Sequence, residues 1–120
     1  MKVMVVDDSS SVRSLLRMIL APLQCELAEC EDGSEAVKRY PQIRPDLVLM
    51  DIEMPVMDGF TATELLISGD PSASVIMMSQ YSDPNITERS LQSGAKRFIS
   101  KDMLYHLPEI FRTMIKEDRN

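Results

Sequence analysis

Short runs of apolar residues alternate along the chain with longer segments whose apolar residues recur every three or four positions. The runs at 3–6, 47–50 and 75–78 are uninterrupted, which is typical of strands buried on both faces of a parallel sheet. The runs at 27–30 and 97–100 mix apolar and polar residues, as expected of strands nearer a sheet edge. The pattern therefore predicts five strands, three of them central.

The segments between these runs have helical spacing and begin or end at recognisable signals. The first three expected helices are 12–20, with serine caps at 9–11 and Pro22 after it, 33–40, ended by Pro41, and 61–68, ended by Gly69. A fourth begins at Pro84, is capped by Asp83 and is ended by Gly94. A fifth lies around 110–115, and residues 103–107 could form a separate turn before it. Five strands alternating with five helices predict a three-layer α/β domain. The carboxyl ends of its parallel strands meet along one edge.

Composition and charge exclude some classes of function but do not identify one. The 120 residues suit one globular domain, with 44% apolar and 27% charged residues. The net charge of −6 and the scattered basic residues argue against direct nucleic-acid binding. No apolar run approaches the roughly 20 residues that cross a bilayer, and Asp7 comes too early for a signal peptide. We expect a cytoplasmic protein without a membrane partner.

The two cysteines are not expected to form a disulfide. Cys25 and Cys30 would lie about 16 Å apart along a strand. A disulfide requires Cα atoms within about 7 Å of each other. We expect each cysteine to act as a small buried hydrophobic residue.

Polar side chains gather where the predicted strands end. Asp7 and Asp8 follow the first strand, Asp51 the third, Ser79 the fourth and Lys101 the fifth. Each has an ordinary explanation alone, as a helix cap, a turn residue or a solvated lysine. Together, three carboxylates at one edge would repel one another. A divalent cation and Lys101 would balance them, since −3 + 2 + 1 = 0, and an all-oxygen ligand set suits Mg²⁺.

Such a site predicts phosphoryl chemistry. A carboxylate beside Mg²⁺ and an ammonium group can attack an electrophilic phosphorus and form an aspartyl phosphate. The cation and Lys101 would neutralise charge on the phosphoryl oxygens, and Ser79 could donate a hydrogen bond to one of them.

Long motifs surround these residues. They are Val5 to Ser9 (VVDDS), 45–59 (PDLVLMDIEMPVMDG), Ser79 and 94–101 (GAKRFISK). With these motifs the sequence resembles the receiver domains of two-component response regulators, over nearly the whole chain. We therefore expect residues 1–120 to be one receiver domain, of the stand-alone chemotaxis type. The resemblance implies a flavodoxin-like, doubly wound sheet with strand order 2-1-3-4-5 and helices on both faces.

The resemblance also implies roles for individual residues. Asp51 would accept a phosphoryl group from a sensor histidine kinase or a phosphotransfer protein. Asp8 and Asp51 would bind Mg²⁺ directly, Asp7 would bind it through water, and Glu53 would contribute its backbone carbonyl. Slow self-dephosphorylation is expected, but no turnover of an external substrate.

The signal would leave through a change of surface. Ser79 matches the family's switch hydroxyl, Lys101 its phosphate-binding lysine and Phe98 its switch aromatic. On spacing alone, Phe98 could equally be a half-buried strand residue. A downstream protein would bind the face formed by the fourth helix, fifth strand and fifth helix.

The loop after Asp51 and two departures from the family pattern give further expectations. Pro55 would fix φ in this loop and Gly59 would allow a positive φ. Asp102 follows Lys101 where the family usually has proline, which leaves a cis or a trans bond open. Gln80 stands where a small residue is common.

The sequence leaves two other functions open. One is a small Mg²⁺-dependent phosphatase, in which Glu53, two positions beyond Asp51, would protonate a leaving group. The other is a receiver-like module that binds partners without phosphorylation. His106 is expected to be an ordinary surface residue.

Overall fold

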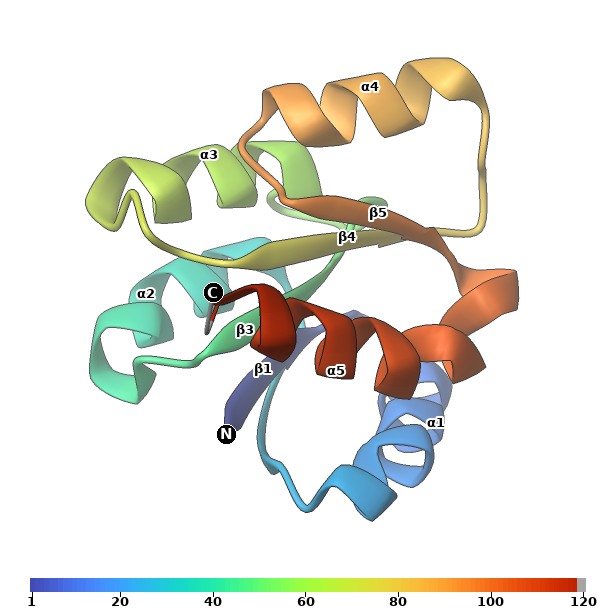
Figure 1. Ribbon diagram of the computed structural model, residues 1–120. Coiled ribbons are helices and arrows are strands. Elements are labelled where there is room, and N and C mark those ends of the chain that lie inside the picture. The colour runs from blue at the N-terminus through green and yellow to red at the C-terminus, as the bar shows by residue number, and fades with distance from the viewer. Residues whose placement is uncertain (119–120) are drawn as a thin grey trace.

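A five-stranded parallel sheet forms the centre of the computed structural model, which describes residues 1–118 (Figure 1). The strands are β1 (Lys2–Val6), β2 (Glu26–Cys30), β3 (Leu47–Asp51), β4 (Val75–Ser79) and β5 (Arg97–Ser100). Their order in the sheet is β2-β1-β3-β4-β5. The doubly wound α/β fold and the flavodoxin-like strand order are therefore confirmed.

Helices cover both faces of the sheet. They are α1 (Ser10–Leu20), α2 (Gly33–Ile43), α3 (Gly59–Gly69), α4 (Pro84–Gln92) and α5 (Leu107–Asp118), with short 3-10 turns at Ala21–Leu23 and Lys101–His106. Helices α1 and α5 pack on one face, and α2, α3 and α4 pack on the other (Figure 1). Within residues 1–118, no helix is long and apolar enough to cross a membrane.

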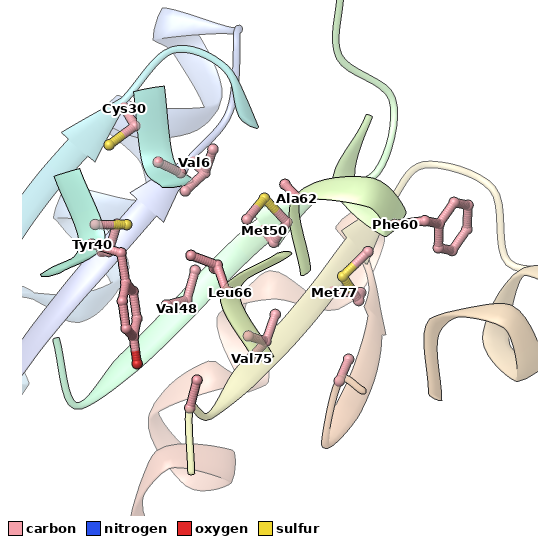
Figure 2. Close-up of a cluster of buried hydrophobic side chains, with 14 of the residues drawn as sticks. Val6, Cys30, Tyr40, Val48, Met50, Phe60, Ala62, Leu66, Val75 and Met77 are labelled. Carbon is pink, nitrogen blue, oxygen red and sulfur yellow. The ribbon is translucent and has the colours of Figure 1, made fainter. Parts of the chain in front are cut away.

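Burial along the strands follows the apolar pattern. Every residue of β3 and β4 is buried, as is all of β1 after its first residue, whereas β2 and β5 are partly exposed. Side chains of β1, β3 and β4 interdigitate with those of α2 and α3 in the core shown in Figure 2. Cys30 lies in this core and Cys25 packs on the opposite one, so the two thiols remain unpaired. The expectation of buried cysteines holds fully for Cys30 and in part for Cys25, which is half-buried.

Four helices begin with a side chain that caps their first turn. Ser9, Asp32, Asp58 and Asp83 each accept a hydrogen bond from the backbone N–H three residues further on. The caps satisfy N–H groups that would otherwise lack partners. Because each helix follows a parallel strand, these four caps lie on the edge where the strands end.

The ends of α4 and α2 differ in how far they follow the sequence pattern. Gly94 ends the α4 region with φ of 109°, as expected of a glycine terminator. The expected end of α2 at Pro41 is wrong, because the helix continues to Ile43. Proline removes one N–H donor from the final turn, and the helix is instead ended by Arg44, which adopts a left-handed conformation and donates its N–H to Tyr40 O.

In the loop between β3 and α3, the expected positive φ at Gly59 is wrong. Gly59 does not have a positive φ; Val56 does, at 70°, and its side chain is 87% exposed. Gly59 is required for a different reason. A Cβ atom there would lie 2.2 Å from the backbone oxygen of Asp51 and 2.8 Å from Ile52 Cα. The glycine lets α3 begin directly against the end of β3.

A hydrogen bond joins α2 to the end of α3 on the side of the sheet where the strands begin. The Tyr40 hydroxyl, near the end of α2, donates to Asp70 Oδ2 at 2.7 Å, just after α3. Burial and this bond raise the pKa of Tyr40. Asp70 also accepts from the backbone N–H and the hydroxyl of Ser72, at 3.1 and 2.7 Å. The carboxylate thus joins two helices at the edge remote from the strand carboxyl ends.

We predict that Gly59→Ala lowers the free energy of unfolding by about 1–3 kcal/mol, because the added methyl group meets backbone that cannot move freely. Gly69→Ala is the matched control, since a Cβ at Gly69 meets nothing within 4 Å. That change should be neutral or raise stability by up to about 1 kcal/mol. Urea unfolding measures both. Equal stabilities for the two variants would contradict the close approach.

Candidate functional site

One lysine joins the two most deeply buried carboxylates. Lys101 Nζ lies 2.9 Å from Asp7 Oδ2 and 3.1 Å from Asp51 Oδ1. Asp7 is fully buried, Asp51 is 1% exposed, and the Lys101 side chain is 20% exposed. These residues come from the ends of β1, β3 and β5, so the sheet has brought together the groups that the sequence placed at one edge.

The position of Asp7 is set by several further contacts. Its backbone N–H donates to Cys30 O at 3.1 Å, and its Oδ1 accepts from the backbone N–H of Ser9 at 2.9 Å. Its carbonyl oxygen accepts from Arg13 Nη1 at 2.7 Å. Both the backbone and the carboxylate of Asp7 are therefore held before any ligand binds.

Arg13 is a structural contributor that the sequence did not reveal. Its Nε lies 3.1 Å from Glu29 Oε1 on β2, and Arg17 pairs with the other oxygen of Glu29. Arg13 thus links α1, β2 and the backbone of Asp7. Its only signal in the sequence is a basic residue in the first turns of the first helix, which is too common to single out.

Three carboxylates form a group that suits a cation. Oxygen atoms of Asp7, Asp8 and Asp51 all lie within 4.8 Å of one another. Asp7 Oδ2 and Asp51 Oδ1 are buried, and among the described residues the Lys101 amine is the only positive group paired with them. With all three ionised, the net charge with Lys101 is −3 + 1 = −2. An all-oxygen site with this charge fits a hard divalent cation.

The electrostatics of the group show the same shortage of positive charge. Burial raises the pKa of Asp51 to about 7, and the charge of Asp7 adds to the effect, while Lys101 opposes it. Burial by itself would lower the pKa of Lys101. The hydrogen bond to Asp7 and the charge of Asp51 outweigh burial and raise that pKa above its ordinary value.

Ser79 reaches the same edge but faces a partner that the sequence did not predict. Its hydroxyl oxygen lies 2.9 and 3.0 Å from Glu53 Oε1 and Oε2, to which it donates. The same oxygen accepts from the backbone N–H of Tyr81 at 2.9 Å. The side chain of Ser79 is fully buried, whereas Glu53 is exposed.

The remaining predicted residues lie where their strands and loops place them. Phe98 is half-buried on β5, pairs in register with Met77 and packs against the core beneath α2, α3 and α4. Gln80 and Asp102 are exposed beside Ser79 and Lys101. The bond between Lys101 and Asp102 is trans, since residues 1–118 contain no cis peptide bond. His106 is a surface residue near Glu109.

Comparison with known proteins identifies this arrangement. Residues 3–112 match the response regulator receiver domain. The chain belongs to this family. A receiver domain is a signalling domain of two-component systems, and phosphorylation is its input. The site built around Lys101 lies within the matched region.

Individual relatives agree with the family. The chain is 40% identical to the chemotaxis protein CheY of Listeria monocytogenes, over 84% of this chain and 86% of that protein. It is also 40% identical to the chemotaxis protein CheY of Bacillus subtilis, over 83% and 84%. The CheX-CheY-BeF3-Mg complex from Borrelia burgdorferi aligns with a TM-score of 0.82 at 32% identity, covering 92% of this chain and 88% of that one. The receiver domain is therefore similar to single-domain chemotaxis receivers.

The raised pKa of Asp51 predicts a pH dependence in metal-free buffer. Between about pH 4 and pH 7 the folded receiver keeps a proton on Asp51 that the unfolded chain has lost. The stability from this group is fully present below that window and is lost as pH rises through it. We expect the free energy of unfolding to fall by about 2 kcal/mol or more across the window.

Asp51→Asn should remove most of this fall, because asparagine does not titrate. Urea unfolding with a chelator present, at several pH values, measures it. Glu64→Gln, which changes an exposed carboxylate on α3, should keep the wild-type profile. The same pH profile in Asp51→Asn and wild type would contradict the raised pKa.

Proposed function

We propose that Asp51 accepts a phosphoryl group from the phosphohistidine of a sensor kinase or phosphotransfer protein, and that this charge change alters the surface offered to a partner. The observation that supports it best is the position of Lys101, within 3.1 Å of Asp51 and 2.9 Å of Asp7. A partly buried amine beside a carboxylate at a strand end is placed to neutralise negative charge arriving on that carboxylate. The predicted self-dephosphorylation would reverse the switch slowly.

The transfer step requires an ionised Asp51. One of its oxygens attacks phosphorus, a new P–O bond forms, and the P–N bond to the donor imidazole breaks with its electron pair leaving on nitrogen. Lys101 would compensate charge on the phosphoryl oxygens. Because Lys101 also binds Asp7, the amine is already in position and needs no ordering during the reaction.

The acidic group is the proposed magnesium site. Asp8 and Asp51 would be direct ligands, Asp7 a ligand through water, and Glu53 a ligand through its backbone carbonyl. Bound there, Mg²⁺ would supply positive charge to the phosphoryl oxygens and favour the ionised form of Asp51. The exposure of Asp8 gives the cation a route from solvent, since Asp7 and Asp51 are buried.

The output would pass from Ser79 through Phe98 to the face of α4, β5 and α5. A phosphoryl oxygen is an acceptor for the Ser79 hydroxyl, and movement of the β4–α4 loop would change the space available to Phe98. Two exposed apolar side chains, Leu91 on α4 and Tyr105 in the turn between β5 and α5, are suited to contact with a protein. The Borrelia relative was solved in complex with the protein CheX.

We propose that residues 1–120 act together as one receiver domain in the cytoplasm, where the phosphohistidine of a kinase is presented. The proposed partners are that kinase or phosphotransfer protein and a downstream target protein. Neither nucleic acid nor membrane is a proposed direct partner. The net charge of −6 is unfavourable for approach to a phosphate backbone.

Treatment with a small-molecule phosphoryl donor and Mg²⁺ should add one phosphate to the wild-type protein. Asp51→Asn should abolish this addition, because the nucleophilic carboxylate is gone. Intact-protein mass spectrometry measures the product. Asp58→Asn is the control: Asp58 caps α3 on the same edge, asparagine caps equally well, and labelling should persist. Phosphate that remains on Asp51→Asn would overturn the assignment.

Magnesium binding gives a test in which two substitutions act in opposite directions. Asp8→Asn should weaken Mg²⁺ binding about tenfold, because a ligand charge is lost. At a pH where all three carboxylates are ionised, Lys101→Met should strengthen it, because removal of the amine takes the group from a net charge of −2 to −3. The same Lys101 variant should bind the phosphoryl mimic beryllofluoride more weakly. Calorimetric titration measures both ligands, and weaker Mg²⁺ binding by Lys101→Met would contradict the proposed site.

A further inference from the structure

The Ser79 hydroxyl donates the only hydrogen it has to Glu53. A serine hydroxyl carries a single hydrogen. With Glu53 Oε1 at 2.9 Å and Oε2 at 3.0 Å, that hydrogen lies between the two oxygens of one carboxylate. The Tyr81 N–H occupies an acceptor position of the same hydroxyl at 2.9 Å. Ser79 therefore cannot donate to a second group without leaving Glu53.

The two partners differ in what they lose when the contact breaks. Ser79 is fully buried, so its hydroxyl would need another acceptor, because an unsatisfied buried donor is costly. Glu53 is exposed, so water can solvate its carboxylate at once. The contact therefore persists while no other acceptor is near, and can be exchanged when one appears.

We propose that Glu53 is a positioning residue that holds the Ser79 hydroxyl in the unphosphorylated protein and competes for it with the phosphoryl group. The proposal rests on the proposed function of Asp51 and Ser79. Glu53 lies two residues after Asp51, so a phosphoryl group on Asp51 would add negative charge near this carboxylate. Repulsion then favours departure of Glu53, and the phosphoryl oxygen replaces it as acceptor.

The contact sets how much binding free energy the phosphoryl group must supply to move the Ser79 hydroxyl from Glu53 toward Asp51. A ligand shifts a two-state equilibrium only by its preference for one state over the other. Loss of the Glu53 acceptor would raise the population in which Ser79 is free to turn toward Asp51. Binding of a phosphoryl mimic would then become tighter, because less of its binding energy goes into breaking the contact.

The first arm of the test examines the protein without Mg²⁺ or mimic. In Glu53→Ala the Tyr81 amide NMR resonance should shift, because the hydroxyl that accepts its N–H has lost its acceptor. In Glu53→Gln the shift should be smaller, since the amide oxygen can still accept from Ser79. Glu64→Ala removes an exposed carboxylate on α3 and should leave the resonance unchanged. An unchanged Tyr81 amide in Glu53→Ala would overturn the proposal.

The second arm is a double-mutant cycle on the affinity for beryllofluoride in Mg²⁺. Glu53→Ala should tighten binding roughly three- to tenfold when Ser79 is present and clearly less in Ser79→Ala, where only the lost charge of Glu53 acts. Glu53→Ala and Glu53→Gln both keep the backbone carbonyl of residue 53, which is the proposed Mg²⁺ ligand. Equal tightening in the two backgrounds would mean that Glu53 acts by charge alone, which overturns the positioning role.

The arms separate this proposal from the proposed function. Wild-type protein that does not bind beryllofluoride would contradict the role of Asp51, while the Tyr81 amide would still decide whether Glu53 holds Ser79. Wild-type binding with an effect of Glu53→Ala that does not depend on Ser79 would retain the phosphoacceptor and reject the contact as a competitor.

Discussion

The burial of two carboxylates against a single amine is the constraint on which this structure depends. Asp7 and Asp51 have almost no access to water, and Lys101 is their shared counter-charge. Isolated buried charges are strongly unfavourable, so such a group persists only when the surrounding fold holds it. The central strands supply that support, since β1 and β3 are neighbours in the sheet and end side by side at these residues. The excess negative charge favours binding of a cation, and the amine of Lys101 is the positive group beside Asp51.

The fold could be predicted from the sequence because each level of the pattern agreed with the others. Uninterrupted apolar runs marked β1, β3 and β4, and the mixed runs marked the edge strands. The residues at the strand ends then predicted a site without any knowledge of side-chain positions, since parallel strands place their ends on one edge. The position of Lys101 beside Asp7 and Asp51 agrees with that reasoning.

The contacts that escaped prediction depend on side-chain direction and on local backbone shape. Nothing in the spacing of Glu53 and Ser79, 26 residues apart, shows that their side chains would meet. Arg13 was missed for the same reason. Gly59 was correctly singled out but for the wrong cause, because the sequence does not reveal how closely α3 approaches the Asp51 carbonyl. Pro41 likewise failed as a helix end because the final turn tolerates the loss of one donor.

The hydrogen bond from Tyr40 to Asp70 makes the side of the domain where the strands begin different from the side where they end. Where the strands begin, a buried phenol donates to a carboxylate that also accepts from the backbone and the hydroxyl of Ser72. Where the strands end, two buried carboxylates share the single amine of Lys101. The amino ends of the strands are therefore closed by contacts within the chain, whereas the excess negative charge at their carboxyl ends leaves a place where a ligand can bind.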